Sequence, residues 1–318
     1  MLERGPSQPL FEDAGVPEDL DEEFGFCEAL RQRGGGGAAG EAELEATFGA
    51  HRKRHVTEET IWQVKALGLN CVRVPFGYWV VTGPTRGDPY CGPCMEHLDN
   101  VVQWCEKHGL QVLLDLHGNP GGESGEKPCG KADATWTFNE WRRDEAIHVL
   151  RVIAGRFKDF ACVAGIQVAN ETGRKVDPKR LCQHYVDCAK AIREAGMAPD
   201  KVAVVCPYYF LPPPMGTSSR HTFLRCWRQN FANLDHCILD VHYYYFDDFN
   251  REVISGSLAS QVQRNGSELD SLPAAVVGEF SAMRPPNCSS LSMQDFFSDQ
   301  IDVYLPKVTT DTSPLIKP

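Results

Sequence analysis

Short apolar segments alternate with amphipathic ones along the chain from residue 57 to residue 280. The amphipathic segments carry apolar residues at near-helical spacing, which predicts helices at 57–68, 98–109, 144–157 and 180–196. Continuously apolar runs rich in β-branched residues follow these helices and recur later, which predicts strands at 71–75, 110–118, 163–171, 201–207, 237–244 and 274–280. Helices that alternate with fully apolar strands are typical of a parallel sheet covered by helices.

Polar residues near the ends of these strands decide between an open sheet and a closed barrel. They are Arg73, Asp115, His117, Asn170, Glu171, His242, Tyr244 and Glu279. An open sheet binds its ligand at one switch point, whereas a barrel brings the carboxyl ends of all its strands around one mouth. No glycine-rich phosphate-binding motif follows any strand. We therefore expect an α/β fold, a (β/α)8 TIM barrel.

The chain divides into three parts on composition. Residues 1–50 hold acidic clusters and the run GGGGAAG at 34–40, so we expect this N-terminal segment to be poorly ordered. We expect residues 51–305 to form the barrel domain, and residues 306–318 to form a polar C-terminal tail.

The net charge narrows the classes of partner. The 43 acidic residues outnumber the 32 basic ones and give a formal charge of −11, which repels nucleic acid and anionic lipid. The chain has no apolar run long enough to span a membrane, and its first residues lack the basic and apolar regions of a secretory signal. We expect a soluble, unexported chain with a neutral or cationic ligand, and neither nucleic acid nor membrane as a partner.

Two glutamates carry the strongest candidate chemistry. Glu171 and Glu279 each close an otherwise apolar strand, where an isolated carboxylate is costly unless it is paired or functional. Paired carboxylates on either side of a sugar are the usual apparatus for glycoside cleavage. The alternative is a structural role, in which a buried carboxylate pairs with an arginine such as Arg73.

A histidine and a tyrosine end the strand at 237–244. His242 and Tyr244 are two residues apart, so their side chains share one face of the strand. Such a histidine can hold a proton network, and a tyrosine hydroxyl can lower the pKa of a carboxylate nucleophile. The alternative is an aromatic cluster that only packs the end of the strand.

The thirteen cysteines leave at least one unpaired and do not settle the redox compartment. Cys91 and Cys94 form a CxxC motif, which raises the alternative of a thiol-redox protein. Its place on a loop rich in proline and glycine favours a disulfide or a solvated loop instead. No second cysteine or histidine pair has the spacing of a zinc site, and the proposed chemistry requires neither a metal nor an organic cofactor.

Five motifs together resemble the exo-β-1,3-glucanase branch of glycoside hydrolase family 5: LGLNCVRVPFGYWVV, LLDLHGNPGG, GIQVANE, DVHYYYFDDF and VVGEFSA. The resemblance covers residues 55–285 and implies a retaining (β/α)8 β-glycosidase that hydrolyses β-1,3-glucan. It implies that Glu171 is the acid/base and Glu279 the nucleophile. It also implies a set of residues that hold the substrate or support the nucleophile: Arg73, His117, Asn170, His242 and Tyr244.

The two carboxylates need opposite environments for these roles. Arg73 beside Glu279 would keep the nucleophile ionised, whereas Glu171 needs a raised pKa to donate a proton. We expect the protein to act as a monomer on β-glucan or an oligosaccharide. The family is usually secreted or bound to the cell wall, although this chain shows no signal peptide.

Aromatic residues follow several of the strands and either stack on sugar rings or pack the fold. They are Phe76, Tyr78, Trp79, Trp136, Phe138, Trp141, Tyr208, Tyr209 and Phe210.

The chain departs from the family at both ends of the barrel. We find neither the GVNLGGW-like first strand nor the tryptophan-rich eighth strand, which are neighbours in a closed barrel. An open edge of buried strands is unfavourable, so either the tails fill the gap or the chain is truncated, and we favour truncation. The alternative function is therefore a catalytically impaired, truncated homologue or a non-catalytic β-glucan-binding protein.

Overall fold

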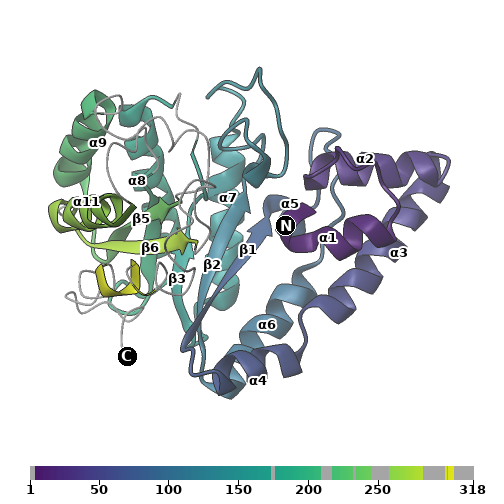
Figure 1. The fold of residues 1–318 in the computed structure, drawn as a ribbon, viewed down its shortest axis with the longest axis horizontal. Coiled ribbons are helices and arrows are strands. Elements are labelled where there is room, and N and C mark those ends of the chain that lie inside the picture. Colours follow the sequence, from purple (N-terminus) through teal and green to yellow (C-terminus); the bar gives the residue numbers. More distant parts are fainter. Residues whose placement is uncertain are drawn as a thin grey trace.

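The structure, a computed structural model, describes residues 4–172, 176–208, 217–231, 234–244, 258–281, 298 and 300–303. At its centre is a sheet of six parallel strands in the order β1-β2-β3-β4-β5-β6 (Figure 1). The strands are β1 (Cys71–Gly77), β2 (Gln111–Gly118), β3 (Val163–Gln167), β4 (Ala203–Pro207), β5 (Cys237–Tyr243) and β6 (Ala275–Phe280). All six coincide with predicted strands.

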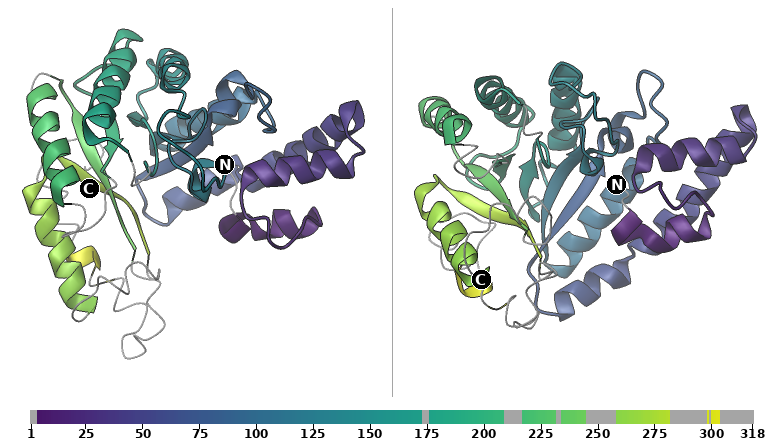
Figure 2. Two further views of the ribbon diagram at one scale, coloured as in Figure 1. Left: turned by 90° about the horizontal axis from the view of Figure 1, so that it is seen from above. Right: turned by 45° about the horizontal axis from the view of Figure 1, so that its top comes forward.

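Within the described residues, a long helix lies between each strand and the next. These helices are α6 (Met95–His108), α7 (Arg143–Phe157), α8 (Pro178–Glu194), α9 (Thr217–Asn230) and α11 (Leu258–Ser271). Figure 2 shows the sheet curling, with α7, α8, α9 and α11 along its outer side. Because each strand pairs with the next one in the chain, the order never reverses and the sheet has no switch point, as in a barrel.

The two faces of the sheet carry different residues because side chains alternate along a strand. Val112 and Leu114 of β2 belong to the large apolar core, which also contains buried residues of the covering helices. Leu113 lies in a separate small cluster with Ala203, Val205 and Ile238, on the inner face. Polar residues of β2 and β5 continue that inner face toward the carboxyl ends of the strands, where the candidate site residues were predicted.

The barrel is incomplete over the described residues, as predicted. Within that part of the chain, no strand precedes Cys71 and none follows Phe280. The strands β1 and β6 therefore lie at the two edges of the sheet, and β6 is only half-buried, whereas all residues of β3 and β4 are buried. The fold is a curled, six-stranded part of a (β/α)8 barrel.

The N-terminal segment differs from the expectation that residues 1–50 are poorly ordered. It forms the helices α1 (Arg4–Asp13), α2 (Glu23–Arg33) and α3 (Gly37–His55), and α4 (Glu58–Ala66) follows. The glycine run makes a turn rather than a flexible linker, because Gly35, Gly36 and Gly37 adopt the positive φ values that a tight connection needs. The helices bury a small apolar core of their own, which contains Leu10, Phe11, Ala14, Phe26, Cys27, Leu30, Leu44, Phe48 and Cys91.

A buried hydrogen bond ties this helical unit to the barrel. Glu23 of α2 accepts the indole N–H of Trp79 at 2.9 Å, and Trp79 lies in the short helix α5 (Tyr78–Thr82) directly after β1. The Trp79 ring stacks on Tyr90 with 3.6 Å between ring centroids. Glycine is required at position 77, next to the Trp79 ring, because a Cβ at this position would lie 2.2 Å from the indole.

Two further parts of the sequence prediction concern the C-terminal tail and membrane-spanning segments. The predicted C-terminal tail at 306–318 lies outside the described residues. In the described part of the chain, no helix is both long enough and apolar enough to pass through a membrane.

Candidate active site

The carboxyl ends of the strands bring all seven predicted site residues into one network. Arg73 comes from β1, His117 from β2, and Asn170 and Glu171 from the segment directly after β3. His242 lies on β5, Tyr244 follows it, and Glu279 lies on β6, where it is the register partner of His242. Because parallel strands end at the same edge of the sheet, residues far apart in sequence meet here.

Arg73 is the centre of the network. Its Nη1 donates to Glu279 Oε1 at 2.6 Å, and its Nη2 donates to Asn170 Oδ1 at 2.8 Å. The same Nη2 lies 3.0 Å from Asp115 Oδ2, which in turn is 2.6 Å from His117 Nδ1. Burial alone would lower the pKa of Arg73, but the negative charges of Asp115 and Glu279 outweigh it and raise that pKa. The guanidinium therefore stays charged.

Glu279 is held as a carboxylate. Both of its oxygens accept hydrogen bonds, Oε1 from Arg73 and Oε2 from the hydroxyl of Tyr244. Burial alone would raise the pKa of Glu279, but the positive charges of His242 and Arg73 and the Tyr244 hydrogen bond lower it to about 2. Burial and the same negative charge raise the pKa of Tyr244, so its hydroxyl remains a donor.

His242 links the two glutamates. Its Nδ1 lies 2.7 Å from Glu171 Oε1 and 3.6 Å from Glu279 Oε2. Ligand atoms of these three residues all lie within 4.8 Å of one another. Burial alone would lower the pKa of His242, but Asp240, Glu171 and Glu279 outweigh it and raise it to about 10. The imidazole is therefore a cation near neutral pH.

Three further polar residues lie beneath this network and were not among the predicted site residues. Asp115 is fully buried between Arg73 and His117. Gln167 accepts from Arg73 Nε at 3.0 Å and donates to Asp240 Oδ2 at 2.9 Å. A signal for Asp240 and Gln167 exists in the sequence, since each is a polar residue inside an otherwise apolar strand.

The cluster of Glu171, His242 and Glu279 is compact enough to surround a cation. However, a ring nitrogen binds a metal through its lone pair, and the carboxylates around His242 favour the protonated ring, which has no free lone pair. The arrangement therefore favours a proton over a metal ion.

The aromatic residues that follow the strands pack the fold. Seven of those that were candidates for sugar stacking are buried: Phe76, Tyr78, Trp79, Trp136, Phe138, Trp141 and Tyr208. Trp136 and Trp141 also donate their indole N–H groups, to the Gly121 carbonyl at 3.1 Å and to Asn119 Oδ1 at 3.2 Å respectively. The remaining candidates, Tyr209 and Phe210, lie outside the described residues.

The CxxC motif does not have the features of a redox centre. Cys91 and Cys94 are both buried free thiols, so the expected disulfide or solvated loop is wrong. Burial raises the pKa of Cys91, and it raises that of Cys94 to about 11, whereas a reactive thiol needs a lowered pKa. The structure thus argues against the thiol-redox alternative.

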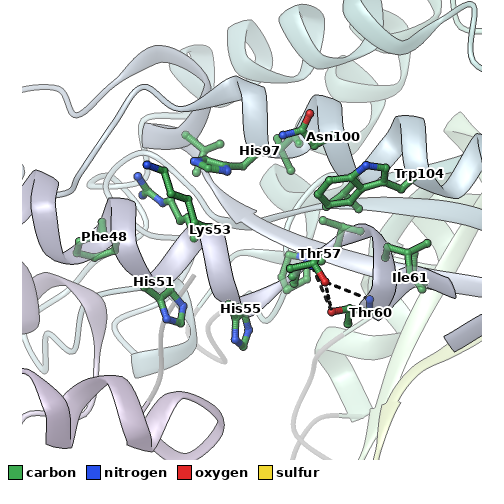
Figure 3. Close-up of a pocket in the computed structure, with 18 of the residues that line it drawn as sticks. Phe48, His51, Lys53, His55, Thr57, Thr60, Ile61, His97, Asn100 and Trp104 are labelled. Carbon is green, nitrogen blue, oxygen red and sulfur yellow. Dashed lines mark hydrogen bonds between the residues drawn. The ribbon is translucent and has the colours of Figure 1, made fainter. Parts of the chain in front are cut away.

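A cavity of about 640 Å³ lies beside the network, along the edge of β1 and between α3, α4 and α6 (Figure 3). Arg73 is the only one of the seven predicted site residues that lines it. Its wall includes His51, His55 and Trp104, and Thr57 and Thr60 form a reciprocal capping box at the start of α4. The cavity marks the open side of the incomplete barrel, and the candidate chemistry lies next to it.

Comparison with known proteins agrees with the geometry. A family model described as Cellulase (glycosyl hydrolase family 5) matches residues 37–300. A probable glucan 1,3-beta-glucosidase A of Aspergillus terreus is 27% identical over 253 residues, covering 79% of this chain and 55% of that protein. A glucan 1,3-beta-glucosidase of Pichia angusta is 29% identical over 273 residues, covering 84% of this chain and 56% of that protein. The chain spans about half the length of the curated relatives it matches.

Solved structures extend the likeness to the fold. The crystal structure of rutinosidase from Aspergillus niger is similar with a TM-score of 0.66 at 16% sequence identity, covering 93% of this chain and 81% of that chain. At this identity, the likeness concerns the fold alone. The family match, by contrast, includes all seven residues of the network and most of the chain. This protein therefore belongs to glycosyl hydrolase family 5, the cellulase family, as its sequence motifs predicted.

Proposed function

We propose that this protein is a retaining β-glycosidase that hydrolyses O-glycosidic bonds of β-1,3-glucan by double displacement, in polysaccharide breakdown. One observation carries the proposal: carboxylate oxygens of Glu171 and Glu279 lie within 4.8 Å of each other. Retaining enzymes hold their carboxyl groups about 5–5.5 Å apart, whereas inverting enzymes leave about 6.5–9.5 Å for a water molecule. The choice of substrate is supported by the names of the curated relatives, glucan 1,3-beta-glucosidases.

The two glutamates have different roles in this proposal. The ionised Glu279 attacks the anomeric carbon, while Glu171 gives its proton to the leaving oxygen as the glycosidic bond breaks. A covalent bond between Glu279 and the sugar results. Glu171, now a carboxylate, then takes a proton from water, whose oxygen attacks the same carbon and releases Glu279. The depressed pKa of Glu279 supports the nucleophile role, because only the carboxylate can attack.

The other residues bind the sugar or orient the glutamates. The Asn170 oxygen accepts from Arg73, which leaves the amide NH2 group to donate to the sugar 2-hydroxyl. Asp115 holds His117 through Nδ1, which leaves Nε2 for another sugar hydroxyl. Arg73 and Tyr244 hold both oxygens of Glu279 in place.

The remaining predictions about partners and location belong to the same proposal. The protein acts as a monomer on a neutral glucan, and nucleic acid is not a partner, in keeping with a formal charge of −11. Members of the family are usually secreted or bound to the cell wall.

The test is hydrolysis of a laminarin-type β-1,3-glucan and of aryl β-glucosides, with product analysis. Glu279→Gln should abolish turnover of both substrates, because the amide cannot form the glycosyl ester. Glu171→Ala should slow glucan hydrolysis about a hundred- to ten-thousandfold, the usual contribution of acid–base catalysis. The same variant should keep activity on aryl glucosides with good leaving groups, and added azide should restore turnover with a β-glycosyl azide product.

Glu268→Gln is the matched control. Glu268 lies on α11, outside the sheet, and its partner is Arg220 of α9, so this variant should keep wild-type rates. Undiminished turnover in Glu279→Gln, or an azide product of inverted configuration, would contradict the proposal.

The half-buried edge strand β6 favours one alternative, a non-catalytic glucan-binding protein. Binding to insoluble β-1,3-glucan without release of sugar from the wild-type protein would support that alternative.

A further inference from the structure

A second carboxylate lies beneath His242 and belongs to the same strand. Asp240 is 2% exposed, and its Oδ2 lies 3.1 Å from His242 Nε2. The side-chain amide of Gln167 donates to this same oxygen at 2.9 Å. Asp240 and His242 are two residues apart on β5, so both side chains face the interior of the barrel.

Its neighbours fix the position of Asp240. Gln167 Nε2 also donates to the Ala169 carbonyl, while Gln167 Oε1 accepts from Arg73, so the orientation of the amide is determined on both sides. On the facing strand, a Cβ on Gly278 would lie 2.2 Å from Asp240 Oδ1. The carboxylate therefore has room only because β6 carries glycine at this position, directly before Glu279.

Both ring nitrogens of His242 face carboxyl oxygen atoms, which accept hydrogen bonds wherever they carry no proton. Nε2 faces Asp240, and Nδ1 faces Glu171 at 2.7 Å and Glu279 at 3.6 Å. A neutral imidazole has one N–H group and could satisfy only one of these sides. The other titratable groups of the cluster are Arg73 on β1 and Asp115 and His117 on β2, and Tyr244 packs edge-on against the ring with centroids 6.5 Å apart. With Asp240 on one side and Oε1 of Glu171 as an acceptor on the other, the ring donates from both nitrogens.

We propose that Asp240 is a positioning residue that fixes His242 as a doubly protonated bridge and thereby gives the two oxygens of Glu171 different roles. Oε1 accepts from His242 throughout the reaction, and Oε2 carries the proton that is exchanged with the leaving group and with water. This inference rests on the proposed function for the role of Glu171. Asp240 itself touches neither the substrate nor the bond that breaks.

Without the Asp240 charge, Nε2 loses the carboxylate that favours its proton. The ring could then become neutral and take either tautomer, and Glu171 would lose a donor that is always present. The oxygen that carries the acid proton would no longer be defined. The loss should therefore fall on the acid role of Glu171 and spare the nucleophile, whose other partners Arg73 and Tyr244 remain.

The test uses Asp240→Asn in the full chain, because asparagine keeps the shape and removes the charge. The measured quantity is kcat/KM, which reports the step that forms the glycosyl-enzyme. On β-1,3-glucan we expect a fall of about ten- to a hundredfold, carried by kcat rather than by KM. On dinitrophenyl β-glucoside, whose leaving group needs no acid, kcat/KM should stay near the wild-type value. An equal loss on both substrates would overturn the proposal.

A second measurement does not depend on activity. The ring nitrogens of His242, assigned by comparison with His242→Gln, should give the NMR shifts of an imidazolium in the wild-type protein at pH 8. In Asp240→Asn, the ring should lose its proton at a lower pH than in the wild type. A neutral His242 ring in the wild type, or titration unchanged by the substitution, would overturn the proposal even if the variant were inactive for another reason.

The two measurements also separate this inference from the proposed function. If the wild-type protein hydrolyses neither substrate, the proposed function fails, while the NMR comparison still decides whether Asp240 holds His242 as a cation. Glu268→Gln serves again as the control for loss of a carboxylate away from the site, and it should change neither kcat/KM nor the His242 titration.

Discussion

Two glutamates, one half-buried and one fully buried, show how neighbours decide the state of a carboxyl group. Glu279 faces Arg73 and His242, and their charges lower its pKa to about 2 despite burial. Glu123 is fully buried in the loop after β2, and burial raises its pKa to about 8. Its Oε2 accepts the Asn119 N–H at 3.2 Å, which is too little to offset desolvation. Glu123 is therefore a neutral acid at pH 7.

Glu123 should make the stability of the protein fall as the pH rises. The pKa of Glu123 is higher in the folded state than its ordinary 4.5. The contribution of its neutral form to the free energy of unfolding is therefore fully present below pH 4.5 and is lost as the pH rises toward 8. Glu123→Gln removes this loss. In urea unfolding, the free energy of unfolding of the variant should equal that of the wild type at pH 5. At pH 8 it should be higher than that of the wild type by about 1 kcal/mol or more.

The control is Glu28→Gln, at an exposed position on α2. Its free energy of unfolding should stay within about 0.5 kcal/mol of the wild-type value at both values of pH. The His242 ring, with a pKa of about 10, also loses its stabilising proton at alkaline pH in every variant. An identical decline from pH 5 to pH 8 in Glu123→Gln and in the wild type would show that Glu123 is already ionised.

At the level of single residues, the sequence predicted those groups that end a strand. Glu171 and Glu279 stand out because each closes an apolar run. Asp240 lies inside such a run and two residues before a histidine, so the same argument about buried charge applies to it. Glu123 lies in a loop rich in glycine, where the sequence does not indicate that folding will bury it completely.

Single helices of this fold are amphipathic units that cover the sheet. On α7, Ile153 is fully buried in the main core, while its neighbour Val152 is 36% exposed. Ile153→Ala should lower the free energy of unfolding by about 2–5 kcal/mol, because it leaves a cavity in a packed interior. Val152 is also β-branched and lies in the same helix, and Val152→Ala should change the free energy of unfolding by less than about 1 kcal/mol. Equal effects in thermal or urea unfolding would contradict the assigned face of α7.

The six strands were predicted correctly because apolar runs of that length form buried strands in almost any surrounding. The helices α1, α2 and α3 were not predicted, whereas α4 was. Their core residues, such as Phe26 and Leu44, are sparse, and the glycine run between α2 and α3 resembles a flexible linker. In the structure, Gly40 instead allows close packing of the two helices, since a Cβ there would lie 2.6 Å from the Arg31 carbonyl oxygen. Such a contact between helices is a tertiary property that local pattern does not contain.

In the molecule as a whole, the unequal burial of the strands should produce unequal protection of the backbone. Each inner strand is bonded on both sides, whereas β1 and β6 have a neighbouring strand on one side only among the described residues. In hydrogen exchange measured by mass spectrometry, amides of β3 and β4 should exchange at least about tenfold more slowly than those of β6. This ratio corresponds to a difference of about 1.4 kcal/mol in the free energy of local opening. Equal protection of inner and edge strands would indicate that the edges are covered.

The position of Arg73 in the network has a consequence for biosynthesis. Arg73 and Glu279, which hold each other by two opposite charges, are 206 residues apart in the chain. On the ribosome, Arg73, Asp115, Glu171 and Asp240 all emerge before β6, the strand that brings Glu279. Contacts between such distant residues form late, because the whole intervening loop must close first. A nascent chain thus carries every cation and all but one carboxylate of the network before it has Glu279, so the network, with the proposed nucleophile, is complete only when translation has passed this residue.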